Sequence, residues 1–177
     1  MTDARLPLSP AGTAEPQAPS ILQQWLRLSV ADLVCAVPIE RVREILQVGR
    51  LTTMPRTPAV VRGVMNLRGA VVPVVDLGQR LARRSVDVGR RSCIVVVELA
   101  ACDDYAASTM GLLVDGVFEV ADIAPEAVSA VPPLGTPVPA DYLRGILQID
   151  RRPVHLLEID RVLAQPELAE MIGSHAD

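Results

Sequence analysis

Runs of apolar residues broken by short polar turns recur from residue 21 onward, and they predict a succession of short strands. The clearest run, VRGVMNLRGAVVPVVDL at 61–77, predicts two strands joined by a turn at Arg68-Gly69. Trp25 to Val30, a turn at Ala31-Asp32 and Leu33 to Val37 predict an earlier hairpin. The same pattern predicts strands at 91–99 and 110–121, and a second hairpin over about 143–158.

Helical signals are few and short. PIERVREIL, from Pro38, predicts one helical turn followed by an extended stretch. DLGQRLA at 76–82 predicts a short helix capped by Asp76. DRVLAQPELAEMIG near the end has a helical period, with Pro166 suited to a helix start and Gly173 to a stop. We therefore expect a C-terminal helix and tail over 165–177.

Two other segments are rich in proline. Residues 1–20 contain four prolines among Ala, Thr and Ser, have little to bury, and predict a disordered N-terminal tail rather than a signal peptide. Residues 122–140 contain five prolines and predict a long extended connection. We therefore place the folded domain at 21–164. A membrane-spanning helix needs about 18 consecutive apolar residues, and no apolar run in the sequence is nearly that long. We therefore expect no membrane insertion.

The chain contains an internal repeat. Residues 61–81 align without gaps on 143–163, with apolar positions matched, Arg62-Gly63 on Arg144-Gly145, and Asp76 on Glu158. Each copy reads as a hairpin, an acidic residue and a short helix. The repeat predicts two similar small β-barrels in one chain, a short-stranded β architecture with little helix.

Composition narrows the function classes. Half of the 177 residues are hydrophobic but only 2% are aromatic, so Val, Leu, Ile and Ala must build the core. The net charge of −4 argues against a nucleic-acid partner, which needs a broad positive face. The three cysteines, Cys35, Cys93 and Cys102, have no CxxC spacing, so we predict no disulfide scaffold and no metal site.

Catalytic groups are scarce. His155 lies in an apolar strand, His175 is the third residue from the end, and no HExxH or GxSxG motif occurs. The acidic residues that follow apolar strands suit turn and cap roles, and no glycine-rich phosphate cradle is present. The sequence therefore predicts a protein that is not an enzyme and that needs no cofactor.

One charge cluster has two readings. The segment RLARRSVDVGRR holds Arg80, Arg83, Arg84, Arg90 and Arg91. It is either a solvated helix end and turn, or a patch for an acidic partner surface or an anionic ligand. Clustered arginines beside a small barrel resemble receptors for a cyclic dinucleotide or second messenger, although their [DN]xSxxG motif is absent. That receptor is our alternative function.

Four ordered segments covering residues 22–164 resemble the CheW-type chemotaxis coupling proteins. GVMNLRGAVVPVVDL is similar to the hallmark segment of that family. The other three are AVPIERVREIL, MGLLVDGVFEV and DYLRGILQIDRRPVHLLEIDRVL. The resemblance implies a mainly β fold of two small five-stranded SH3-like β-barrels packed together, with short helices and a C-terminal helix.

The resemblance also implies a role. A protein of this kind is a non-enzymatic, cytoplasmic adaptor, recruited to receptor arrays at the membrane. It couples the cytoplasmic tips of methyl-accepting chemoreceptors to the regulatory domain of a CheA-type histidine kinase in ring-like arrays. The pathway could be swimming chemotaxis, surface motility or second-messenger output, and the sequence does not separate these.

The expected receptor-binding residues follow from the same resemblance. The receptor hairpin would dock beside the turn formed by Asn66, Leu67, Arg68 and Gly69, where Arg68 reaches an acidic or carbonyl acceptor. Gly69 is expected to take the positive φ of a tight turn. Glu44 would contribute to the contact, and Val42 and Cys93 would line an apolar groove. The alternatives are an exposed turn arginine without a partner and a solvated Glu44.

Overall fold

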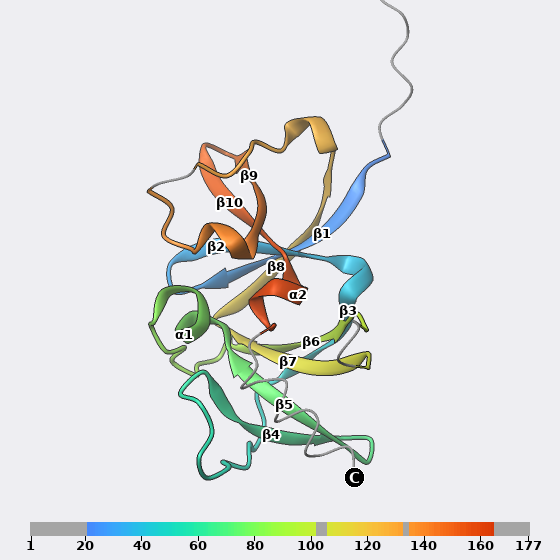
Figure 1. Cartoon of the computed structure of the whole chain (residues 1–177), viewed down its shortest axis with the longest axis vertical. Helices are drawn as coiled ribbons and strands as arrows, with labels where there is room; N and C mark the ends of the chain where they lie inside the picture. Colours follow the sequence, from blue (N-terminus) through green and yellow to red (C-terminus); the bar gives the residue numbers. More distant parts are fainter. Residues whose placement is uncertain (1–20, 102–105, 133–134, 165–177) are drawn as a thin grey trace, which may run out of the picture.

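The structure, a computed structural model, describes residues 21–101, 106–132 and 135–164 (Figure 1). These residues contain ten strands and a few short helices. In chain order the elements are β1 Gln23–Val30, β2 Leu33–Pro38, η1 Ile39–Arg41, β3 Val42–Gln47, β4 Val61–Leu67, β5 Ala70–Asp76, α1 Leu77–Ala82, β6 Cys93–Leu99, β7 Ser108–Val114, β8 Gly116–Ile123, η2 Pro125–Ala127, η3 Ala140–Tyr142, β9 Leu143–Ile149, β10 Arg152–Leu157 and α2 Ile159–Val162.

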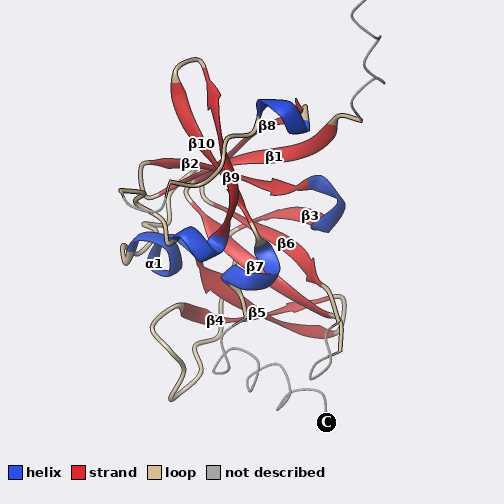
Figure 2. Cartoon of the chain, turned by 45° about the horizontal axis from the view of Figure 1, so that its top comes forward, coloured by secondary structure: helices blue, strands red, loops and turns tan. Residues whose placement is uncertain are grey.

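The strands form two five-stranded sheets with the same plan (Figure 2). Sheet A has the order β8-β1-β2-β10-β9, and sheet B has the order β3-β6-β7-β5-β4. Each sheet contains one parallel pair, β2 with β10 in sheet A and β5 with β7 in sheet B, while its other neighbours are antiparallel. The mainly β fold of two five-stranded SH3-like units is confirmed.

Three apolar clusters hold the sheets together. The largest lies between the two sheets, and each sheet also wraps around a smaller cluster of its own. In β6, Val95 and Val97 belong to the central cluster, whereas Ile94 and Val96 belong to the cluster of sheet B. Because both faces of this strand are buried over Ile94 to Val97, its sequence is apolar there without alternation.

The backbone confirms the internal repeat, with β4–β5–α1 and β9–β10–α2 as its two copies. Arg68-Gly69 in the first hairpin and Asp150-Arg151 in the second all have positive φ, as a two-residue turn of type I′ requires. An isolated bridge joins Thr52 to Val64, and its counterpart joins Ser129 to Ile146, 82 residues after Val64. The copies therefore share their hairpins, turns and flanking bridges.

An acidic residue closes each repeat. Asp76 Oδ2 accepts a hydrogen bond from Arg62 Nη1 at 3.0 Å, and Glu158 Oε2 accepts one from Arg144 Nε at 2.7 Å. The hydrogen bond to Glu158 raises the pKa of the Arg144 guanidinium. Asp76 also accepts from the Gln79 N–H and so caps α1, as predicted. Each acid therefore bonds to the arginine near the start of its own hairpin, and Asp76 also joins its hairpin to α1.

The expectation of a single strand at 110–121 is wrong. The segment forms two strands, β7 in sheet B and β8 in sheet A, separated by Asp115. The Asp115 carboxylate accepts from the Ala31 N–H at 2.7 Å, and the Asp115 N–H donates to the Ser29 carbonyl at 2.9 Å. These bonds hold the chain where it passes from sheet B to sheet A. In the sequence the apolar residues on both sides of Asp115 give no sign of that passage.

The remaining predictions of local structure have mixed outcomes. The helical turn after Pro38 is η1, and helix α1 spans Leu77–Ala82. The connection at 122–140 is less extended than predicted, because it contains η2 and the start of η3. The expected N-terminal tail at 1–20 and the helix and tail at 165–177 lie outside the described residues. Among the residues that are described, no helix is long and apolar enough to cross a membrane.

Candidate functional site

The turn between β4 and β5 has the geometry of a tight hairpin. Arg68 has φ +53° and Gly69 has φ +86°, and Leu67 pairs with Ala70 across the ladder. The Asn66 side-chain oxygen accepts a hydrogen bond from the Gly69 N–H at 3.0 Å. Gly69 thus takes the positive φ that the turn requires, and Asn66 holds the turn from inside. The sequence NLRG therefore presents the Arg68 side chain at the tip.

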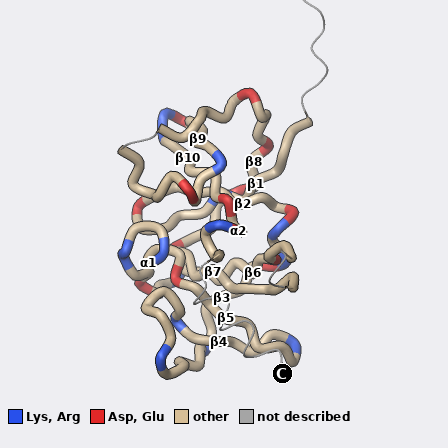
Figure 3. The backbone as a smooth tube through the Cα atoms, in the orientation of Figure 1, with Lys and Arg blue, Asp and Glu red and all other residues tan. Residues whose placement is uncertain are grey.

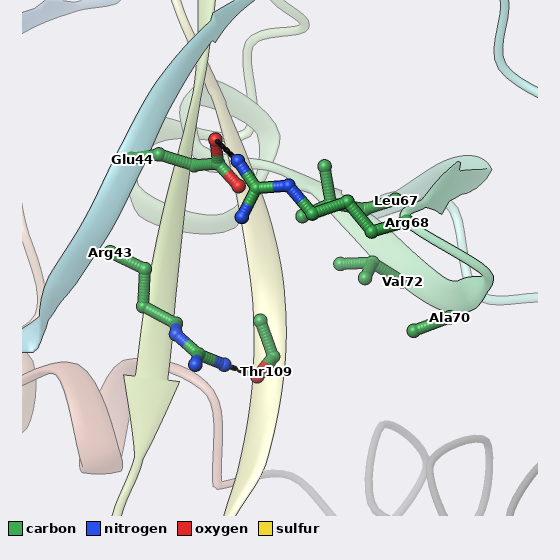
Figure 4. Close-up of a pocket in the computed structure, with 7 residues that line it drawn as sticks. All are labelled: Arg43, Glu44, Leu67, Arg68, Ala70, Val72 and Thr109. Atoms are coloured by element: carbon green, nitrogen blue, oxygen red, sulfur yellow. Dashed lines mark hydrogen bonds and ion pairs between the residues drawn. The ribbon is translucent and has the colours of Figure 1, made fainter.

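A groove lies beside this turn, and we call it the Arg68 groove (Figure 4). Strands β3, β4, β5 and β7 contribute to it, with the Arg68 turn at one end. Leu67 and Val72 supply apolar surface, and polar groups stand around them. Its lining residues are Arg43, Glu44, Leu67, Arg68, Ala70, Val72 and Thr109. An apolar floor with a few polar groups suits the docking of a protein segment.

Within the chain, Arg68 pairs with Glu44. Arg68 Nη2 lies 3.2 Å from Glu44 Oε2, and Figure 4 shows the guanidinium reaching from the hairpin toward β3. The Arg68 side chain is 80% exposed and that of Glu44 is 23% exposed. Exposed ion pairs of this kind stabilise a protein by about 0–1 kcal/mol. Arg68 can therefore leave Glu44 for another acceptor at little cost.

A second arginine lines the same groove. Arg43 Nη1 donates to Thr109 Oγ1 at 3.4 Å, and Arg43 Nε lies 3.3 Å from Glu98 Oε1. Both Arg43 and Glu98 are more than half exposed, so this contact is also weak. Arg43 and Arg68 thus stand at the groove as two cations, each in a weak exposed pair that a ligand carboxylate or carbonyl could replace.

Val42 and Cys93 do not line the Arg68 groove. Both are half-buried and pack against the central cluster between the sheets. Cys93 lies at the opposite end of the β3–β6 ladder from Val42, because Cys93 pairs with Gln47 and Val42 pairs with Val97. Cys93 Sγ donates to the Arg91 carbonyl, and burial raises the pKa of its thiol. Of these predicted residues, Arg68 and Glu44 therefore line the groove, whereas Val42 and Cys93 pack against the central cluster.

The arginine cluster does not converge on one point. Arg80 Nε donates to the Val162 carbonyl at 2.7 Å, and its guanidinium lies 4.9 Å from the centre of the Tyr142 ring. Arg84 pairs with Asp32 at 2.7 Å. Figure 3 shows basic residues around α1. The other three cluster members, Arg83, Arg90 and Arg91, are exposed.

These contacts weigh against the anionic-ligand alternative. Arg80 joins α1 to α2, so its guanidinium serves the packing of the repeats. Arg83 ends α1 in the left-handed conformation, with φ +54°. A nucleotide site needs several cations directed at one anion, and the described contacts do not bring these five arginines together.

His155 and Cys35 are buried. His155 is buried in β10, and its Nδ1 lies 3.2 Å from the Val34 carbonyl. Burial raises the pKa of the Cys35 thiol to about 12, so this thiol stays neutral at physiological pH. Among the described residues no group of three His, Cys, Asp or Glu side chains could hold a metal ion.

Sequence reasoning missed Arg43 and Thr109. They lie on β3 and β7, which do not pair with each other, and only the folding of sheet B brings them to one groove. A partial signal was available for Arg43. The segment VREILQ has alternating half-buried and exposed positions, and Arg43 occupies an exposed one.

Comparisons with known proteins agree with this geometry. The family model described as "CheW-like domain" matches residues 24–167. A probable chemotaxis protein CheW of Rhizobium etli is 32% identical over 82% of this chain and 90% of its own length. Protein FrzA of Myxococcus xanthus is 34% identical over 80% of this chain and 85% of its own length. The scaffolding protein TtCheW of Thermoanaerobacter tengcongensis superposes with a TM-score of 0.73 at 25% identity, covering 86% of this chain and 94% of that one. With two five-stranded sheets, a matched family model and relatives above 30% identity, the chain belongs to the CheW-like family.

Proposed function

We propose that this protein is a non-enzymatic chemotaxis adaptor that couples the cytoplasmic tips of chemoreceptors to a CheA-type histidine kinase. The observation that carries the proposal is the Arg68 groove, in which a projecting arginine stands beside apolar surface in a chain of the CheW-like family. Relatives named chemotaxis protein CheW support a role in chemotaxis. The protein acts in the cytoplasm, at receptor arrays beneath the membrane.

The receptor tip binds at the Arg68 groove by an exchange of partners. Arg68 leaves Glu44 and donates to a carboxylate or carbonyl on the receptor, while Leu67 and Val72 pack against its apolar side chains. Asn66 and Gly69 keep the turn rigid, so little conformational entropy is lost on binding. Val42 and Cys93 support the receptor site without contacting the receptor, because they pack β3 and β6 against the central cluster.

The kinase regulatory domain binds a separate surface of the adaptor, so that one molecule joins both partners. Each contact is weak, since transient signalling interfaces lie at the small end of the size range, near 1,200 Å² in total. A micromolar contact corresponds to about −8 kcal/mol. In ring-like arrays of receptors, adaptors and kinases such contacts gain avidity, because each bound partner raises the effective concentration of the next binding site.

The test is a titration of isotope-labelled protein with the receptor-tip hairpin and, separately, with the kinase regulatory domain from the same genome. We expect two separate patches of amide shifts, with Arg68 in the receptor patch. Arg68→Glu should weaken receptor binding at least about tenfold, because it replaces a charged donor by an acid. Arg90→Glu is the matched control, an exposed arginine that does not line the groove.

Three outcomes would contradict the proposal or part of it. Absence of binding to both partners would reject the adaptor role. Unfolding of the Arg68→Glu variant would show that the arginine is structural, contrary to its 80% exposure. Competition between receptor and kinase domain for one patch would reject the two-surface arrangement.

A further inference from the structure

The described part of the chain ends beside the Arg68 groove. Its last residue, Ala164, comes directly after the turn that ends α2. Within α2, Asp160 pairs with Arg41 at 2.7 Å. Arg41 also donates to the Glu98 carbonyl at 3.2 Å, and the Glu98 carboxylate pairs with Arg43, which lines the groove. A continuous series of contacts thus joins α2 to the groove through the ends of β3 and β6 (Figure 1).

The sequence after Ala164 combines acidic and apolar residues. Residues 165–177, which we call the C-terminal segment, read QPELAEMIGSHAD and contain three acidic residues and no Lys or Arg. In the helix that the sequence predicts at 166–173, the apolar residues recur three and four positions apart, and acidic residues border the face they form. The apolar residues are Leu168, Met171 and Ile172, and the acidic residues are Glu167 and Glu170.

The Arg68 groove offers the complementary surface. Leu67 and Val72 supply apolar surface, and Arg43 and Arg68 supply the cations. The Arg68 side chain is 80% exposed and that of Arg43 is 56% exposed, so their present ion pairs are weak and can be exchanged. A helix with an apolar face bordered by carboxylates can therefore pack on the apolar floor while its acids reach the two guanidinium groups.

The segment is close enough to reach the groove without a long linker. One extended residue spans at most about 3.6 Å, and the predicted helix begins two positions after Ala164. Its eight residues, at about 1.5 Å each, give a helix about 12 Å long. A short connection makes the effective concentration of the segment high, on the order of 1 mM.

The repeat builds an equivalent groove on sheet A, which suits the segment less well. Its lining residues are Arg27, Val34, Phe118, Ile149, Asp150, Arg152 and Val154. Asp150 stands 82 positions after Arg68, at the turn of the repeated hairpin. Phe118 takes the position of Arg43, because each lies at the bulge of an edge strand. A carboxylate and a phenyl ring thus replace two cations, and the described chain ends beside the other sheet.

We infer that the C-terminal segment docks in the Arg68 groove of its own chain and competes there with the receptor tip. The competition rests on the proposed adaptor function, whereas the docking itself does not. An intrinsic Kd of about 0.1 mM, against an effective concentration of about 1 mM, keeps the segment docked in about nine-tenths of the molecules. The receptor then binds about tenfold more weakly than it binds an open groove.

The first test follows the amide signals of the isotope-labelled full-length protein without any partner. Glu170→Arg should shift the signals of Leu67 to Val72 and of Thr109, because it releases the segment from the groove. Met171→Ser should shift the same signals by removing an apolar contact. Asp177→Arg is the matched control, since it makes the same change of charge in the same segment but outside the predicted helix.

Three results of this test would overturn the inference. One is the absence of any shift in the groove with both variants. Another is a set of shifts around Phe118 and Asp150, which would place the segment on sheet A. The third is a set of shifts that disappears on dilution, because a second copy of the chain would then supply the segment.

The second test measures the affinity of the full-length protein for the receptor-tip hairpin by calorimetry. Glu170→Arg should raise that affinity about tenfold, and Asp177→Arg should leave it within about twofold of the unaltered protein. Unchanged or weaker binding by Glu170→Arg overturns the competition. If the receptor tip binds none of the three proteins, the proposed function fails, while the amide shifts still decide the docking.

Discussion

Asp76 is the buried acid on which the middle of the protein depends, so its replacement gives a sharp test of the structure. Its side chain is fully buried. The carboxylate accepts from the Gln79 N–H at 3.0 Å, from the Val86 N–H at 3.0 and 3.2 Å, and from Arg62 Nη1 at 3.0 Å. Asp76→Ala removes a helix cap, an ion pair and the acceptor of a buried N–H in a single change.

The expected loss is large. The helix cap contributes about 1 kcal/mol. The buried Val86 N–H, left without an acceptor, costs about 1–3 kcal/mol. Loss of the Arg62 partner brings the total to about 3–5 kcal/mol, as for the removal of one partner of a buried ion pair. At about 2–4 °C per kcal/mol for a domain of this size, the melting temperature should fall by about 10 °C.

Urea unfolding followed by circular dichroism measures the difference, with equal m-values required for a valid comparison. The repeat supplies its own control in Glu158→Ala. Glu158 makes no side-chain cap bond, is 24% exposed, and pairs with Arg144, so its removal should cost only about 1 kcal/mol. A loss below about 1 kcal/mol for Asp76→Ala, or an equal loss for both variants, would refute the reasoning from burial.

Three further substitutions test single positions. Gly63→Ala should cost more than about 2 kcal/mol, because the added Cβ would lie 2.5 Å from the Thr52 carbonyl oxygen at φ +151°. Gly69→Ala should cost only about 1 kcal/mol, since its positive φ is strained but nothing lies within 4 Å. Chemical unfolding measures both, and equal losses would contradict the assigned packing. Cys35 should add pH dependence in alkali: its folded pKa of about 12 exceeds the unfolded value, so its stabilisation is full below about pH 8.5 and is lost as pH rises toward 12. Cys35→Ala should flatten that slope relative to the unaltered protein.

Much of the local structure could be predicted from sequence because its causes are local. Asn66-Leu67-Arg68-Gly69 forms the turn it indicates, since Gly69 adopts positive φ readily and Asn66 reaches its N–H. Asp76 caps α1 from the position directly before the helix. The repeat could also be predicted, because both copies keep the same apolar positions and have an acidic residue directly after the hairpin.

The crossing at Asp115 could not be read in this way. Residues on both sides of it are apolar, and β7 and β8 look like one strand. The bonds that divide them come from Ser29 and Ala31, more than 80 positions away, and no local pattern reports such partners. A strand with both faces buried carries no alternation, so periodicity gives neither its end nor its sheet.

The sequence by itself determined most of the strands, the tight turns, the repeat and the resemblance that led to Arg68, because these depend on neighbouring residues. Only the tertiary structure decided what surrounds Arg68. Glu44 pairs with Arg68 from β3, and Arg43 and Thr109 line the same groove from strands that are distant from the turn in the chain. The tertiary structure also decided that Phe118, on edge strand β8 of sheet A, takes the position that Arg43 has on edge strand β3 of sheet B.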